Sequence, residues 1–119
     1  MRIRISHVMI DVLDPDALAP FWAELLGVEV ASRIDEGRFV FLSAAEGAPA
    51  IGLQRVPERK ETKNRVHVDL EVEDLDAAVT WVRSHGGSRV ADHRLGDFHW
   101  RVMADPEGNE FCLVPVSGG

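Results

Sequence analysis

The chain has 119 residues, 45% of them hydrophobic, which suits a single folded core. Its formal net charge is −7 and no run of Lys or Arg occurs, which argues against nucleic acid and membrane surfaces and leaves a small molecule or another protein as partner. One cysteine and an N-terminus without a long apolar run predict a cytoplasmic protein with no internal disulfide and no signal peptide.

The first half of the chain predicts one helix and four strands. Ile3 to Val12 alternates between apolar and polar residues, as a strand does. Asp14 followed by Pro15 is typical of a helix start, and Gly27 is typical of a helix end. Turn residues then separate three further strands, predicted over 28–33, 38–43 and 50–56.

The second half repeats this order. A strand is predicted over Val66 to Val72, and Asp74 then caps a helix that ends at Gly86-Gly87. The turn Asp105-Pro106-Glu107-Gly108 leads into a last strand, because Pro suits the second position of a type I turn and Gly the fourth.

The two halves match at one offset, the 60 residues between His7 and His67. Equivalent positions carry the same residue at Asp14 and Asp74 and again at Gly27 and Gly87. We therefore predict an internal duplication. One domain over residues 1–119 would contain two βαβββ repeats, at about 1–56 and 65–116.

Strand parity predicts the two faces of each sheet. Apolar residues such as Leu53 and Leu113 fall on the face that the helix covers. The opposite face is mostly polar, and it would line a cleft if the two units curl around a common space. The residues predicted on this face are His7, Met9, Asp11, Gly52, Gln54, Arg65, His67, Asp69, Glu71, Glu110 and Cys112.

Three residues of the polar face are candidate metal ligands: His7, His67 and Cys112. Imidazole and thiolate suit divalent transition metals, so the set is better suited to zinc than to magnesium, and the expected ion is zinc, nickel, iron or manganese. The alternative is that both histidines hydrogen-bond within the cleft and Cys112 is an inert core residue.

Other polar residues are candidates for substrate contact or proton transfer. Glu110 and Asp69 are candidate general bases, or else solvated carboxylates. Arg65 could bind an anionic group or form a surface ion pair. Gln54, Asp69 and His99 complete the expected substrate-binding set, with His99 otherwise a simple loop residue.

The duplicated unit, the segments S-H-V-M-I-D-V and V-H-V-D-L-E-V, and the ending D-P-E-G-N-E-F-C-L resemble the vicinal oxygen chelate superfamily, within it the glyoxalase-like and bleomycin-resistance-like domains. The resemblance covers essentially the whole chain. It implies an α+β fold in which two tandem βαβββ units form an incomplete barrel around a cleft. It also implies a homodimer, and in the enzymes of the superfamily a divalent metal that chelates vicinal oxygens.

Carried over by position, the resemblance assigns metal ligation to His7 and His67. In the second unit the ligand on the last strand is normally a Glu, and the matching residue, seven positions after Asp105, is Cys112. In the first unit the corresponding position on the last strand is Gly52, with Gln54 two residues away. These departures argue against the two-carboxylate site of glyoxalase I and its lactoylglutathione lyase activity.

Two functions remain open from the sequence. One is a metal-assisted isomerase or lyase acting on a small oxygenated metabolite, with Glu110 as the base. The other is a metal-free protein that binds and sequesters a small molecule such as an antibiotic.

Overall fold

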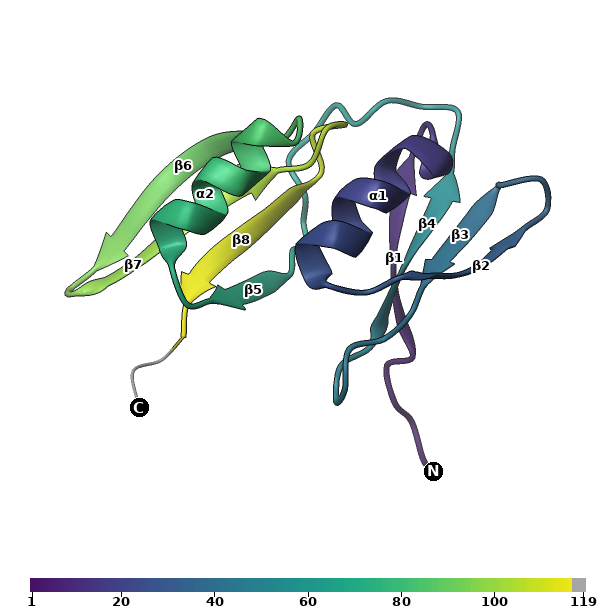
Figure 1. Cartoon of the computed structure of the whole chain (residues 1–119), viewed down its shortest axis with the longest axis horizontal. Helices are drawn as coiled ribbons and strands as arrows, with labels where there is room; N and C mark the ends of the chain where they lie inside the picture. Colours follow the sequence, from purple (N-terminus) through teal and green to yellow (C-terminus); the bar gives the residue numbers. More distant parts are fainter. Residues whose placement is uncertain (117–119) are drawn as a thin grey trace. The chain divides into compact units, whose positions relative to one another are not determined.

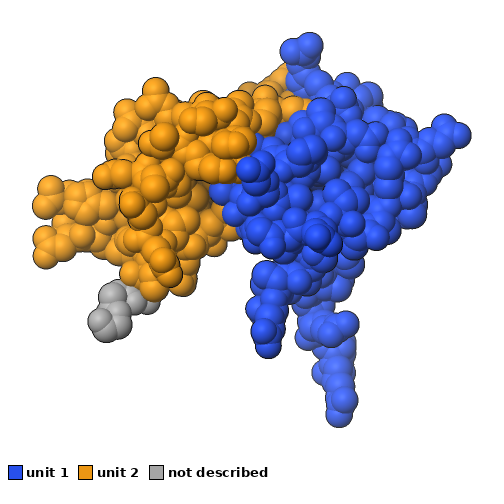
Figure 2. All heavy atoms as spheres, viewed as in Figure 1, with its two compact units in different colours: residues 1–59 blue, residues 60–119 orange. Residues whose placement is uncertain are grey.

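A computed structural model describes residues 1–116, which form two compact units, residues 1–59 and residues 60–116 (Figure 2). Each unit has the order βαβββ (Figure 1). The first contains β1 (His7–Val12), α1 (Pro15–Leu26), β2 (Val30–Ile34), β3 (Phe39–Leu42) and β4 (Ala50–Arg55). The second contains β5 (Asp69–Val72), α2 (Leu75–Ser84), β6 (Ser88–Leu95), β7 (Phe98–Ala104) and β8 (Glu110–Pro115).

The two sheets have the same topology. The strand orders are β1-β4-β3-β2 and β5-β8-β7-β6, so the first strand of each unit is at an edge of its sheet and pairs in parallel with the last strand. The remaining pairs are antiparallel. Both sheets are therefore mixed and open, and the α+β prediction is confirmed.

Both helices begin as predicted. The Asp14 carboxylate accepts a hydrogen bond from the backbone N–H of Ala17, and Asp74 does the same for Ala77. Gly27 ends α1 with φ of 68°, in the left-handed region that glycine tolerates best.

Each helix covers one face of its own sheet and closes a small core (Figure 1). In the first unit α1 packs on β3 and β4, and Trp22 of α1 is buried, as are Val40 and Leu53 of these strands. In the second unit Val82 of α2 is fully buried, as are Phe111 and Leu113 of β8. The predicted parity of β8 is thus confirmed, with Glu110 and Cys112 on the face away from the helix.

The first strand of each unit is shorter than predicted. β1 begins at His7 rather than Ile3, because its partner β4 begins opposite it at Ala50. β5 begins at Asp69 rather than Val66, where pairing with Cys112 starts, and Val66 is 79% exposed. An apolar alternation extends a strand only where a neighbouring strand supplies hydrogen bonds.

Among the described residues, no helix is long and apolar enough to cross a membrane.

Candidate metal site

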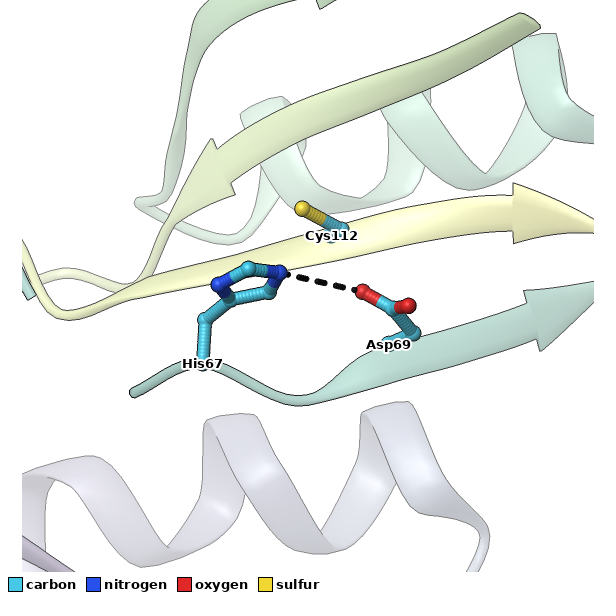
Figure 3. Close-up of side chains that lie close together, drawn as sticks. All are labelled: His67, Asp69 and Cys112. Atoms are coloured by element: carbon cyan, nitrogen blue, oxygen red, sulfur yellow. Dashed lines mark ion pairs between the residues drawn. The ribbon is translucent and has the colours of Figure 1, made fainter. Parts of the chain in front are cut away.

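Three side chains with metal-binding atoms meet on the open face of the second sheet: His67, Asp69 and Cys112 (Figure 3). One donor atom from each lies within 4.8 Å of the other two. His67 Nε2 lies 3.3 Å from Asp69 Oδ1. Imidazole, carboxylate and thiolate are all ligands of zinc and related metals, so this donor set fits a transition-metal ion.

The strands position these groups through register. Asp69 is the first residue of β5, and it pairs directly with Cys112 of the parallel strand β8. His67 lies two residues before Asp69, so it points to the same side of the sheet (Figure 3). The cluster is therefore made by one strand pair within the second unit.

The thiol and its two neighbours differ in exposure. Cys112 is 4% exposed, whereas the side chains of His67 and Asp69 are 51% and 59% exposed. Burial raises the pKa of the Cys112 thiol, and the nearby Asp69 carboxylate raises it further by charge and by a hydrogen bond. At neutral pH the thiol is thus protonated, and a metal ion would have to displace that proton.

Glu110 lies two residues before Cys112 on the same face of β8. Its side chain is 13% exposed and accepts a hydrogen bond from the backbone N–H of Asn64 at 3.3 Å. Lys63 Nζ lies 3.9 Å from the same carboxylate oxygen, and the Asn64 amide donates to the Glu110 carbonyl. The predicted base is therefore held in one orientation by the segment before β5.

The remaining predicted site residues are on other segments of the chain, each described within its own unit. His7 is the exposed first residue of β1, with its ring edge-on to Phe41 at 5.2 Å between centroids. Gln54 is half-buried on β4, and Arg65 is exposed in the segment before β5. His99 lies on β7 beside Arg101, on the face opposite to Cys112 because Val102 is the residue that pairs with Cys112.

The position that corresponds to Cys112 in the first unit is Gly52, paired with Met9 of β1. A Cβ atom added at Gly52 would lie 2.5 Å from Met9 Sδ. In the first unit the Met9 thioether thus occupies the space that corresponds to the cluster of the second unit. Of the three corresponding residues, His7, Met9 and Gly52, only His7 carries a strong metal-binding group.

The sequence predicted Asp69 as a substrate contact or general base rather than as a metal ligand, and it gave no role to Lys63 or Asn64. The spacing His67-x-Asp69 could have suggested a shared face with Cys112, because alternate residues of a strand point the same way. No comparable signal marks Asn64, whose contacts with Glu110 join residues 46 positions apart.

The two βαβββ units, each with an open mixed sheet covered on one face by a helix, define the class of protein as an α+β fold. A family model described as glyoxalase-like domain matches residues 7–114, so the chain belongs to the glyoxalase-like family. A search of curated proteins gives no match to the sequence.

Solved structures share the fold. A glyoxalase/bleomycin resistance protein/dioxygenase family enzyme from Burkholderia phytofirmans superposes with a TM-score of 0.78 and 21% identity, covering 96% of this chain and 99% of that one. A glyoxalase family protein from Bacillus cereus gives 0.78 and 20%, covering 99% and 97%. The trypanothione-dependent glyoxalase I of Leishmania major gives 0.72 and 24%, covering 96% and 87%.

Proposed function

We propose that this chain is a metal-dependent isomerase- or lyase-type enzyme that acts on a small oxygenated metabolite. The observation that carries the proposal is the approach of His67, Asp69 and Cys112 donor atoms to within 4.8 Å of one another. His67 and Cys112 belong to the predicted ligand set, Asp69 joins them, and His7 is retained as a further candidate ligand. The proposed ion is a transition metal, zinc or else nickel, iron or manganese.

In the proposed reaction the metal ligands and Glu110 would have different roles. A bound divalent ion would polarise a substrate oxygen and so acidify the adjacent C–H. Glu110 would take and return that proton, since its carboxylate is on the same strand face as Cys112 and is oriented by Asn64. The exposed sides of His67 and Asp69 would leave room for the substrate.

Cysteine nucleophilic catalysis is less well supported by the same geometry. A nucleophilic thiol needs a base that withdraws its proton and a lowered pKa. Here the neighbouring group that bonds Cys112 is Asp69, whose charge raises the thiol pKa. A metal ligand is the better role for this thiol.

The second candidate function is a metal-free protein that binds and sequesters a small molecule. Gly52 favours this metal-free function, because the residue has no metal-binding side chain and Met9 occupies the space beside it. Aromatic side chains on the open sheet face of the first unit, such as Phe39 and Phe41 with parallel rings 6.3 Å apart, also suit ligand binding without a metal.

A measurement of metal content distinguishes the two proposed functions. Tag-free protein is offered zinc, nickel, iron, manganese and magnesium in turn and measured by elemental mass spectrometry. The enzyme proposal expects near-stoichiometric uptake of one transition metal, lost in His67→Ala and Cys112→Ala and weakened in His7→Ala. Absence of uptake of every metal would contradict it and favour the binding protein.

We further propose a cytoplasmic homodimer. A single cysteine suits a reducing compartment, and exposed apolar residues on the edge strand β2, Val30 and Ile34, each 49% exposed, suit contact with another chain. Light scattering coupled to size-exclusion chromatography tests the dimer; a monomer at high concentration would contradict it.

A further inference from the structure

A groove of about 310 Å³ lies in the second unit, where the end of α2 meets the start of β6. Its lining residues are Arg83 in the last turn of α2, Gly87 in the connection, and Ser88 and Arg89 at the start of β6. This volume is at the lower end of the range for small-molecule sites. The proposed function makes no use of the groove.

The groove is on the opposite face of the sheet from the candidate metal ligands. Arg89 pairs with Met103, and Met103 pairs with the buried Phe111, so the three side chains point to the face that α2 covers (Figure 1). Cys112 follows Phe111 directly and points the other way. A molecule in the groove would therefore not occupy the metal site.

The groove carries more positive than negative charge. One carboxylate oxygen of Asp92 pairs with Arg89 at 3.2 Å, and the other oxygen pairs with Arg101 at the same distance. Two guanidinium groups thus share one carboxylate. Among the described residues no carboxylate pairs with Arg83, and none bonds the Ser88 hydroxyl. The groove therefore offers a ligand the N–H groups of two guanidinium groups and one hydroxyl group.

The first unit indicates that the fold does not require these arginines. The helices end alike, because the backbone N–H of Val28 donates to the Ala23 carbonyl and that of Gly87 to the Val82 carbonyl, each at 2.9 Å. Aligned by these helix ends, the groove residues and their counterparts in the first unit are Arg83 and Glu24, Ser88 and Glu29, and Arg89 and Val30. The same alignment superimposes the irregularities of β2 and β6, which directly follow Val30 and Arg89. The positive charge is thus a feature of the second unit alone.

From these observations we propose that the groove binds a phosphate group, either of a small phosphate ester or of free inorganic phosphate. A guanidinium group donates two parallel N–H groups to one phosphate, and two guanidinium groups match the double charge of phosphate better than the single charge of a carboxylate. Arg83 reaches the phosphate from the helix and Arg89 from the strand, and Ser88 donates its hydroxyl. Both arginines are exposed, so salt screens their charges and the expected affinity for inorganic phosphate is in the millimolar range.

The test titrates inorganic phosphate into the ¹⁵N-labelled full chain at pH 8 and constant ionic strength, with amide chemical shifts as the readout. The shifts should concentrate in residues 83–89, and acetate should bind about tenfold more weakly. Arg83→Gln and Arg89→Gln should each weaken phosphate binding about tenfold, the effect of losing one charged hydrogen-bonding group. Glycerol 3-phosphate is titrated in parallel. Tighter binding of this ester would support an ester as the ligand, and equal binding would support recognition of the phosphate alone.

The matched control is Arg94→Gln, which removes the same charge from the other end of β6, where the Arg94 guanidinium donates to the Gly96 carbonyl. It should change the phosphate affinity by less than about twofold. Equal losses in all three variants would overturn the inference, because phosphate would then respond only to the overall charge. Shifts centred on residues 67–69 and 110–112 would also overturn it, since they would place the phosphate at the metal site. So would a titration that does not saturate.

Discussion

His67 and Asp69 bring their side chains together on one face of the sheet, with Nε2 of the imidazole 3.3 Å from Oδ1 of the carboxylate. The pair lies against the buried thiol of Cys112 (Figure 3). Because both partners are about half exposed, their mutual attraction adds little to stability.

Removal of one cluster residue should abolish metal uptake at little cost in stability. His67→Ala is expected to weaken zinc binding by more than about a hundredfold, because loss of a direct ligand exceeds the 10- to 100-fold effect of losing an outer partner. Competition with a chelating dye measures the affinity. His85→Ala, on α2, is the matched control and should bind zinc normally; unchanged affinity in His67→Ala would refute the ligand assignment.

The Asp69 charge should slow the chemistry of Cys112 in the metal-free protein. Burial and then Asp69 raise the thiol pKa, so Asp69→Asn, which removes the charge, should lower that pKa and increase the thiolate fraction at pH 8. Alkylation by iodoacetamide should become several-fold faster. In urea the two proteins should react equally, and an unchanged native rate would mean that access alone limits the reaction.

Asp105 should be the most costly turn residue to replace. It is 2% exposed, and its carboxylate accepts hydrogen bonds from the backbone N–H groups of Glu107 and Asn109, each at 2.9 Å. Asp105→Ala leaves these donors without that acceptor, so we expect a loss of about 2–4 kcal/mol in urea unfolding. Asp97→Ala, in an exposed turn, should change stability by less than about 0.5 kcal/mol.

Gly52 and Met9 should be energetically coupled. A Cβ at position 52 would meet Met9 Sδ at 2.5 Å and Phe41 Cδ1 at 3.1 Å. Gly52→Ala should cost about 1 kcal/mol, because the flexible thioether can move aside but Phe41 must also shift. In Met9→Ala protein the same change should cost less. Additive free energies of unfolding in this double-mutant cycle would contradict the contact.

The sequence alone was sufficient for the order of elements, for both helix starts and for the end of α1, whereas α2 ends at Ser84 with His85 as its cap rather than at Gly86-Gly87. Asp14, Gly27 and Asp74 act through contacts with residues three or four positions away, so the local pattern contains the necessary information. Strand parity was equally local, and it assigned Glu110 and Cys112 to one face correctly. The starts of β1 and β5 were wrong because they depend on a distant partner strand.

The sequence by itself thus determined two βαβββ units, their apolar faces and the presence of His67 and Cys112 on a polar face. Only the tertiary structure decided which residues of that face meet. The parallel register places Asp69 directly opposite Cys112, and the segment before β5 brings Asn64 onto Glu110. Register between strands some forty residues apart is set by the packing of the whole unit, because shifting it would move apolar side chains off the core, and no short stretch of sequence records it.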